Sequence, residues 1–184
     1  LVLGSQVQVD PTDPTVWAFQ VVATDDSVTD LVVSINNTTV DASGNVLVPD
    51  VNSTYTHTVD TVNPTVVSIA TDNTDTVVSD GDATVTYTVT FSEAVPNFVD
   101  GNIDVTGGSL VLGSQVQVDP TDPTVWELQV IATDDSVTDL VVSINNTTVD
   151  ANGNALIPDA NSTYTHIVDT VNPTVVSIGS SNLD

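Results

Sequence analysis

The chain of 184 residues contains no lysine and no arginine, against 25 aspartate and glutamate residues, so its formal net charge at pH 7 is -25. Binding to phosphate groups depends on cations, and the absence of Lys and Arg therefore excludes nucleic acid as a partner. Anionic membrane surfaces are excluded on the same ground. The unbalanced charge also opposes compaction by self-repulsion, which a bound divalent cation would relieve. Ca²⁺ is the natural candidate.

The residues needed for covalent cross-links and for membrane-spanning segments are absent as well. The chain has no Cys and therefore no disulfide, and without Lys it cannot form a Lys-to-Asn isopeptide bond. No apolar run approaches the roughly 18 residues of a membrane-spanning helix, so we expect no membrane insertion by this segment. No secretion signal begins the chain, as expected for an internal fragment.

The residues typical of enzyme sites are also missing. Neither Cys nor Lys is available as a nucleophile, no Gly-x-Ser-x-Gly motif occurs, and no histidine spacing is typical of zinc. His57 and His166 each lie in a T-Y-T-H-x-V segment, where strand alternation places them on the same face as Tyr and Val. They are interpreted as structural histidines, and we expect no enzyme.

What the chain does contain is a near-exact internal repeat. Residues 1–69 return as residues 110–178 at an offset of 109, with eight substitutions in 69 positions. Repetition at a fixed period is the sequence signature of a tandem array. Since a full period is followed by a partial one, at least one domain is incomplete.

Alternation typical of β-strands dominates each repeat. Residues 83–91 read A-T-V-T-Y-T-V-T-F, which places Val85, Tyr87 and Val89 on one face and threonines on the other. No segment of useful length has a helical period. The strands predicted for one repeat, A to G, are residues 65–69, 83–91, 103–106, 110–118, 125–132, 140–145 and 163–168.

The order of these strands predicts an all-β fold of tandem immunoglobulin-like Greek-key β-sandwiches, with about seven strands per 109-residue repeat. Residues 64–170 form the complete repeat. Residues 1–63 hold only strands D to G of one repeat, and residues 171–184 begin another with its first strand. Half a sandwich leaves an apolar face and a strand edge uncovered. Either the same long polypeptide or another copy, by strand swapping, supplies the missing strands.

Four motifs are similar to those of a known family. They are F-S-E-A-V at residues 91–95, N-I-D-V-T-G-G at 102–108, D-A-N-G-N at 150–154 and V-D-T-V-N-P-T at 168–174. With them the chain resembles the bacterial Ig-like (BIg-type) tandem repeats of giant RTX-type surface adhesins and extracellular filaments. The resemblance implies a secreted, cell-surface extender that is stiffened by calcium and holds a binding tip away from the cell. Its partners would be the neighbouring Ig-like repeats of the same chain.

Acidic residues gather in loops that the sandwich brings to one pole. Because strands alternate in direction, the BC, DE and FG loops share a pole with the entry linker, and the AB and EF loops share the other with the exit linker. Ca²⁺ takes about six to eight oxygen ligands. At the junction near residue 60 the candidates are Asp25, Asp26, Asp60, Asn63, Glu93, Asp150 and Asn154. At the next junction they are Asp134, Asp135, Asp169 and Asn172.

The FG loop itself is a second kind of candidate. Asp41 and Asn45 in one copy, like Asp150 and Asn154 in the other, place a carboxylate and an amide around a glycine that permits positive φ. Such a loop can wrap an ion, although turn formation alone also explains Asp, Asn and Gly. The same two interpretations apply to further acidic turns at Asp50 and Asn52, Asp159 and Asn161, and Asp72, Asp75, Asp80 and Asp82.

Two other functions stay open at this level. A strand-swapped chain would be a self-assembling filament subunit. A carbohydrate- or ice-binding module would need exposed aromatic or threonine arrays. Trp17 and Trp126 alternate with apolar neighbours, which favours core positions, and the threonines of residues 84–90 fit the solvated face of a strand.

Overall fold

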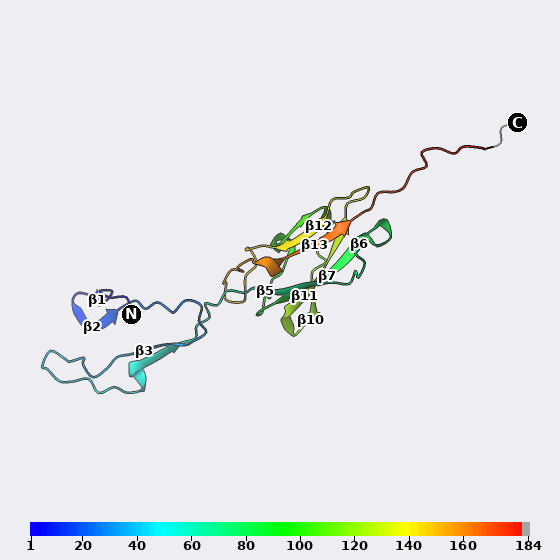
Figure 1. Ribbon diagram of the computed structural model, residues 1–184. Helices are drawn as coiled ribbons and strands as arrows, with labels where there is room; N and C mark the ends of the chain where they lie inside the picture. The colour runs from blue at the N-terminus through cyan, green and yellow to red at the C-terminus, as the bar shows by residue number, and fades with distance from the viewer. Residues whose placement is uncertain (182–184) are drawn as a thin grey trace. The chain divides into compact units, whose positions relative to one another are not determined.

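The computed structural model describes residues 1–181, and the chain divides into two compact units (Figure 1). The first unit is Leu1–Val62 and the second begins at Asn63. Among the described residues, regular structure consists of β-strands and four three-residue 3₁₀ turns, at Val51–Ser53, Asp80–Asp82, Asp100–Asn102 and Ala160–Ser162. The predicted all-β class is therefore confirmed.

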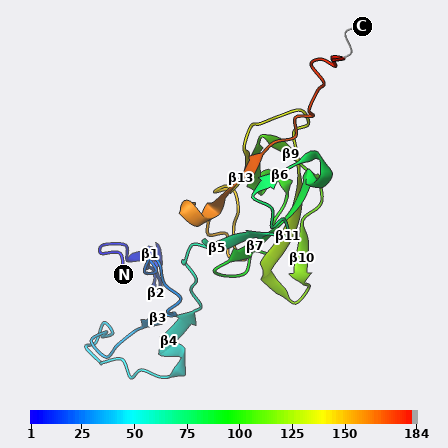
Figure 2. The ribbon, with the colours of Figure 1, turned by 45° about the vertical axis from the view of Figure 1, so that its right-hand side comes forward.

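The second unit contains two sheets (Figures 1 and 2). The first has the order β10-β11-β7-β5, with β9 also paired to β11. The second has the order β6-β13-β12-β8, in which only the β13–β6 pair is parallel. The bounds are β5 Val66–Thr71, β6 Val77–Val78, β7 Thr84–Phe91, β8 Ile103–Thr106, β9 Gly108–Leu110, β10 Val116–Asp119, β11 Asp122–Ala132, β12 Leu140–Ile144 and β13 Thr163–Val168.

The core of the second unit lies between these sheets, and strand β7 shows how the sequence forms it. Val85, Tyr87 and Val89 are fully buried, whereas the threonines between them are half-buried. From the other sheet, Leu140 and Val142 of β12 enter the same cluster and are also fully buried. Burying a side chain of this size contributes about 1.5–3 kcal/mol. The result is a β-sandwich-like fold built on period-two alternation.

The first unit contains two two-stranded sheets. β1 (Val7–Asp10) pairs with β2 (Asp13–Ala18), and β3 (Leu31–Ser34) pairs with β4 (Thr54–His57). By the 109-residue offset these strands are the counterparts of β10 to β13. Strands corresponding to β5, β7 and β8 do not occur among residues 1–62. Most apolar side chains that are buried in the second unit are consequently more exposed at the corresponding positions of the first unit.

The structure corrects several details of the sequence prediction. Residues 110–118 were expected to form one strand, but a turn at 111–115 separates β9 from β10, with φ of 71° at Gly113. Strand β6 was not predicted either, and with the division into β9 and β10 it brings the described strands of the second unit to nine, against about seven predicted. Residues 171–181, expected to begin a further strand, form none, and residues 182–184 lie outside the described residues.

The two tryptophans differ in how far their side chains are exposed. Trp126 is 8% exposed and donates from Nε1 to the carbonyl of Val95 at 3.1 Å, which confirms its predicted core position. Trp17 is 56% exposed, and the core position predicted for it is wrong. In the second unit β7 pairs with β11 and places Val89 opposite Trp126. Residues 1–62 hold no counterpart of β7 beside β2, so Trp17 stays exposed.

Candidate metal site at the entry pole

The BC and FG loops of the second unit lie beside its first residues, Asn63 and Thr65. The side-chain amide of Asn63 donates to the carbonyl of Ala155 at 2.6 Å, which ties the entering chain to the FG loop. The backbone N–H of Thr65 donates to Ser92 Oγ at 3.0 Å, which ties it to the BC loop. The predicted gathering of these loops at the entry pole is confirmed.

Asp150 is held in the FG loop by its own neighbours. Its Oδ1 accepts from the backbone N–H groups of Asn152 and Asn154, each at 2.8 Å, and its Oδ2 accepts from Asn154 Nδ2 at 2.8 Å. Gly153, with φ of 92°, supplies the left-handed turn that brings these donors round. The buried carboxylate is therefore fixed in place.

Glu93 of the BC loop approaches this fixed carboxylate. Carboxylate oxygens of Glu93 and Asp150 lie within 4.8 Å of one another. Burial raises the pKa of Asp150, but the hydrogen bonds from Asn154 and Asn152 outweigh it and leave that pKa below its ordinary value. Asp150 is thus ionised at neutral pH, and no Lys or Arg exists to offset its charge. Oxygen ligands of this kind suit a hard divalent cation.

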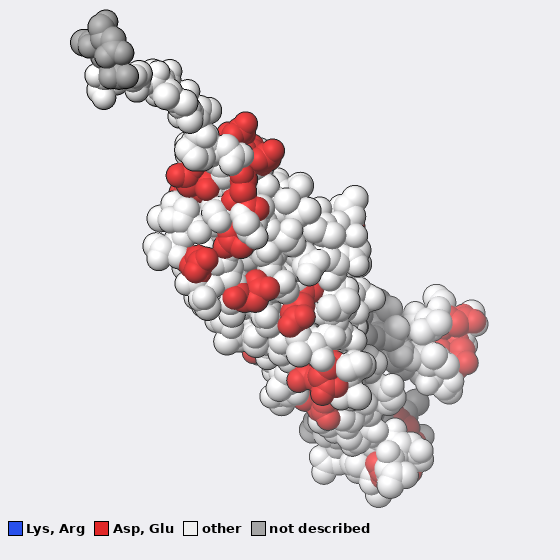
Figure 3. All heavy atoms as spheres, turned by 90° about the vertical axis from the view of Figure 1, so that its right-hand side faces the viewer, with Lys and Arg blue, Asp and Glu red and all other residues white. Residues whose placement is uncertain are grey.

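Acidic side chains are also spread over the surface seen in Figure 3, without a basic neighbour.

Among the other predicted ligands, Asp60 belongs to the first unit, where its Oδ1 accepts from the N–H of Val62 at 3.2 Å. Asp169 repeats this contact with Val171 at 3.2 Å. The exposed residues Asp25, Asp26, Asp134, Asp135 and Asn172 lie in turns or in segments without regular structure.

The FG loop of the first unit has the same internal bonds. Asp41 accepts from the N–H of Asn45 at 2.8 Å and from its side-chain amide at 2.9 Å. The side-chain hydrogen bond from Asn45, followed by its backbone bond, lowers the pKa of Asp41. Asn45 and Asn154 therefore act as donors that close their loops, which is the turn interpretation of these motifs.

The acidic turn near Asp82 is closed in a similar way. Asp82 Oδ1 accepts from the N–H of Ser79 at 2.8 Å and from its hydroxyl at 2.6 Å, and Oδ2 accepts from Asn73 Nδ2 at 2.8 Å. These bonds, the Ser79 side-chain bond foremost, lower the pKa of Asp82. Turn formation accounts for this loop.

Sequence reasoning missed the threonine of the linker. Thr170 is 2% exposed, and its hydroxyl lies between the carbonyl of Thr133 and the N–H of Ser136 in the EF loop. In the first unit Thr61 makes the same contacts with Thr24 and Ser27. No local pattern marks this threonine, because its two partners lie 34 and 37 residues earlier in the chain.

His166 lies in the interior of the second unit. Its Nδ1 is hydrogen-bonded to the hydroxyl of Tyr87 at 3.0 Å, and both residues are buried. Burial lowers the pKa of His166, against a smaller opposing effect of Asp82, and burial raises the pKa of Tyr87. The predicted structural role of this histidine is confirmed.

The chain was compared with models of known protein families, with curated proteins and with solved structures. None of the three comparisons gave a match. Within the described residues, no helix has the length and apolar character needed to cross a membrane. The repeat, the charge and the loop geometry therefore carry the functional interpretation.

Proposed function

We propose that the chain is a structural repeat module of a secreted bacterial cell-surface adhesin or filament, an extender stiffened by Ca²⁺ at the junctions between its repeats. The observation that carries this proposal is the pair of carboxylates, Glu93 and Asp150, within 4.8 Å of one another where the chain enters the second unit. In this role the module acts mechanically and not as an enzyme.

The sheet order supports an immunoglobulin-like assignment for the repeat. Strands β5, β7, β11 and β10 take the places of A, B, E and D in one sheet, and β13, β12 and β8 take those of G, F and C in the other. In such a sandwich the entry and exit of the chain lie at opposite poles, which suits a tandem array. Repetition at a fixed offset is typical of such tandem arrays.

The proposed ion takes Glu93 and Asp150 as its first two ligands and Asp60 as its third. Asp60 precedes Asn63 by three residues, and the side chain of Asn63 is bound to the FG loop at Ala155. Asp60 thus belongs to the same linker as a residue bound to that loop, and we propose it as the ligand that the linker supplies. Backbone carbonyls and water complete the roughly six to eight ligands of Ca²⁺.

Calcium then controls stiffness through charge. Without the ion, the junction carboxylates repel one another and the linker is free to bend. Ca²⁺ neutralises them and joins the linker to the loops of the following repeat. Extracellular sites of this class bind with dissociation constants of about 10⁻⁴–10⁻³ M. Calcium outside the cell is thus sufficient, whereas the low calcium of a cytosol is not.

Equilibrium dialysis of the intact chain with ⁴⁵Ca²⁺ tests the site. Glu93→Gln and Asp150→Asn should each weaken binding at least tenfold, because each removes a charged ligand while keeping the side-chain shape. Asp30→Asn removes the same charge from an exposed position outside the site and serves as the matched control. Equal weakening in all three variants, or no saturable binding in the native chain, would refute the proposal.

A further inference from the structure

The first stretch of the second unit, residues 66–78, takes part in both sheets. Its first part, β5, lies at the edge of one sheet and pairs antiparallel with β7. Its second part, β6, crosses to the other sheet and pairs with β13, the last strand of the unit. Among the strands of the described residues, β6 and β13 form the only parallel pair. This pair joins the beginning of the unit directly to its end.

The β6–β13 pair is short, but it is anchored in the core. Val77 lies opposite Ile167, and Val78 lies opposite Val168. The side chains of Val78 and Val168 are 0% and 2% exposed and belong to the hydrophobic core. Just after the pair, the backbone N–H of Asp169 donates to the carbonyl of Val78 at 2.9 Å. Sliding one strand along the other would break this bond and withdraw two buried valines from the core.

The chain reaches this pair from one pole and leaves it at the other. Before β5, Asn63 is bound to Ala155 at the entry pole. After β13, Thr170 is bound to Ser136 of the EF loop at the exit pole. Because β6 and β13 are parallel, tension between these two points pulls the two strands in opposite directions along their length. Their contacts must then break together, whereas a pair pulled apart from one end opens one bond at a time.

We propose that the β6–β13 pair is a tension clamp, a shear joint that sets the force at which the second unit unfolds when the chain is pulled from both sides. Calcium-controlled stiffness concerns bending at the junction, and the clamp does not need the ion. The inference rests on the proposed extender role only for the source of the tension. Forced unfolding depends on the unfolding rate, so a short pair that breaks first can govern it.

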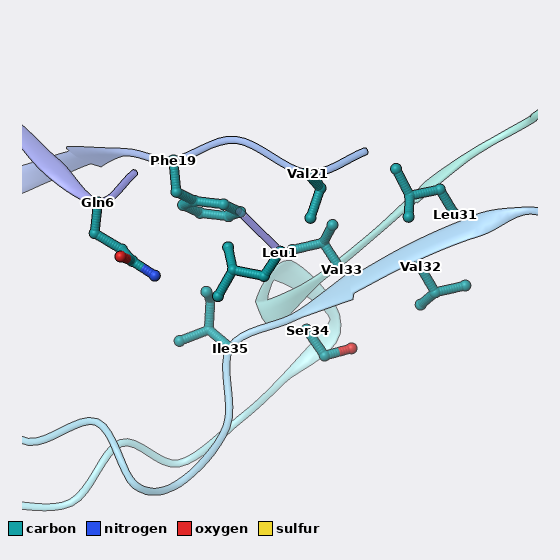
Figure 4. A pocket seen from close by; sticks show the side chains of 9 residues that line it. All are labelled: Leu1, Gln6, Phe19, Val21, Leu31, Val32, Val33, Ser34 and Ile35. Atoms are coloured by element: carbon teal, nitrogen blue, oxygen red, sulfur yellow. The ribbon is translucent and has the colours of Figure 1, made fainter. Parts of the chain in front are cut away.

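The first unit contains no joint of this kind. Both of its strand pairs, β1–β2 and β3–β4, are antiparallel. Figure 4 shows its open hollow of about 350 Å³, which Phe19 and Leu31 help to line. We therefore expect the first unit to yield before the second if it shares the load. Attaching a pulling handle at residue 62 keeps it outside the load path.

Single-molecule force spectroscopy of the intact 184-residue chain in EGTA tests the proposal. The chain has no Cys, so Val62→Cys and Val171→Cys supply the only two thiols for handles, and tension between them loads the clamp along its length. A second chain carries Asp80→Cys and Val171→Cys, which pull the neighbouring ends of β6 and β13 apart. The first chain should unfold at a higher force than the second, by about twofold.

A backbone variant tests the clamp itself. Asp169→Pro removes the N–H that bonds to Val78 and should lower the unfolding force between residues 62 and 171 to about half. Asp169→Ala loses the same carboxylate but keeps the N–H, and in EGTA it should unfold at the native force. Gly107→Ala lies outside the clamp. It should be less stable in urea and still unfold at close to the native force, which separates mechanical resistance from equilibrium stability.

Equal unfolding forces in the two pulling directions would overturn the proposal. So would a native force in folded Asp169→Pro. If Asp169→Pro does not fold, the two pulling directions in the otherwise native chain decide the matter. Calcium binding is measured separately by dialysis, so the clamp and the calcium site can fail independently of one another.

Discussion

The hydroxyl of Thr170 donates a hydrogen bond to the carbonyl oxygen of Thr133 at 2.7 Å. It also accepts from the backbone N–H of Ser136 at 2.9 Å, so the segment that follows β13 is tied to the EF loop. The linker that follows thus leaves the second unit from a fixed point. An extender needs such a fixed exit, because a stiff junction cannot keep the array straight if the chain bends before the junction.

Thr170→Val should destabilise the second unit by about 1–3 kcal/mol, because it leaves a part-buried N–H and a part-buried carbonyl without this partner. Urea unfolding followed by Trp126 emission, in a chain that carries Trp17→Phe, measures the change. Thr174→Val, at an exposed position, is the matched control and should change stability by less than about 0.5 kcal/mol. Equal midpoints for the two variants would contradict the role given to Thr170.

The unfolding free energy of the second unit should fall as pH drops from about 7 to 5. Burial lowers the pKa of His166 in the folded state, so the unfolded state binds its proton more readily. The contribution is present above the unfolded pKa of about 6.5 and is lost as pH falls through the folded value. Urea midpoints between pH 5 and 8 measure it.

The variant His166→Gln isolates this effect. It should be less stable at pH 8 because it loses the bond to Tyr87, and it should show a shallower dependence on pH between 5 and 7. His57→Gln, the exposed copy of the same position, should keep the native slope. A native slope in His166→Gln would assign the pH dependence to other groups.

Gly107→Ala should destabilise the second unit by about 2 kcal/mol or more, through the cost of positive φ and an additional clash. The glycine has φ of 72°, and a Cβ there would overlap the backbone carbonyl of Asp139. Gly101→Ala is the control, since nothing lies within 4 Å of its added Cβ. Thermal unfolding that ranks the two variants equally would contradict this reading of the turn.

Much of the fold follows from alternation alone. The observed β8 and β13 match the predicted strands, since each is a short alternating run bounded by turn residues. Strand β6 is only Val77–Val78 and pairs in parallel with Ile167 and Val168, so no local pattern reveals it. The break between β9 and β10 at Gly113 was not predicted because the residues on either side of it continue the alternation.

The candidate site was predictable where it depends on topology. Antiparallel order places Glu93 and Asp150 at the same pole, and the structure brings their carboxylates together. The internal bonds of Asp150 with Asn154 were harder to foresee, because the same residues suit an ion or a turn. The buried hydroxyl of Thr170 depends on packing between distant segments, which no spacing in the sequence encodes.

The central claim is that calcium stiffens the junction near Asp60. Small-angle X-ray scattering of the intact chain in about 1 mM Ca²⁺ and in EGTA tests it most directly. Calcium should narrow the distribution of interatomic distances to that of a single defined arrangement. The scattering profile of the Glu93→Gln variant should be the same in calcium as in EGTA. Identical profiles of the native chain with and without calcium would contradict the account.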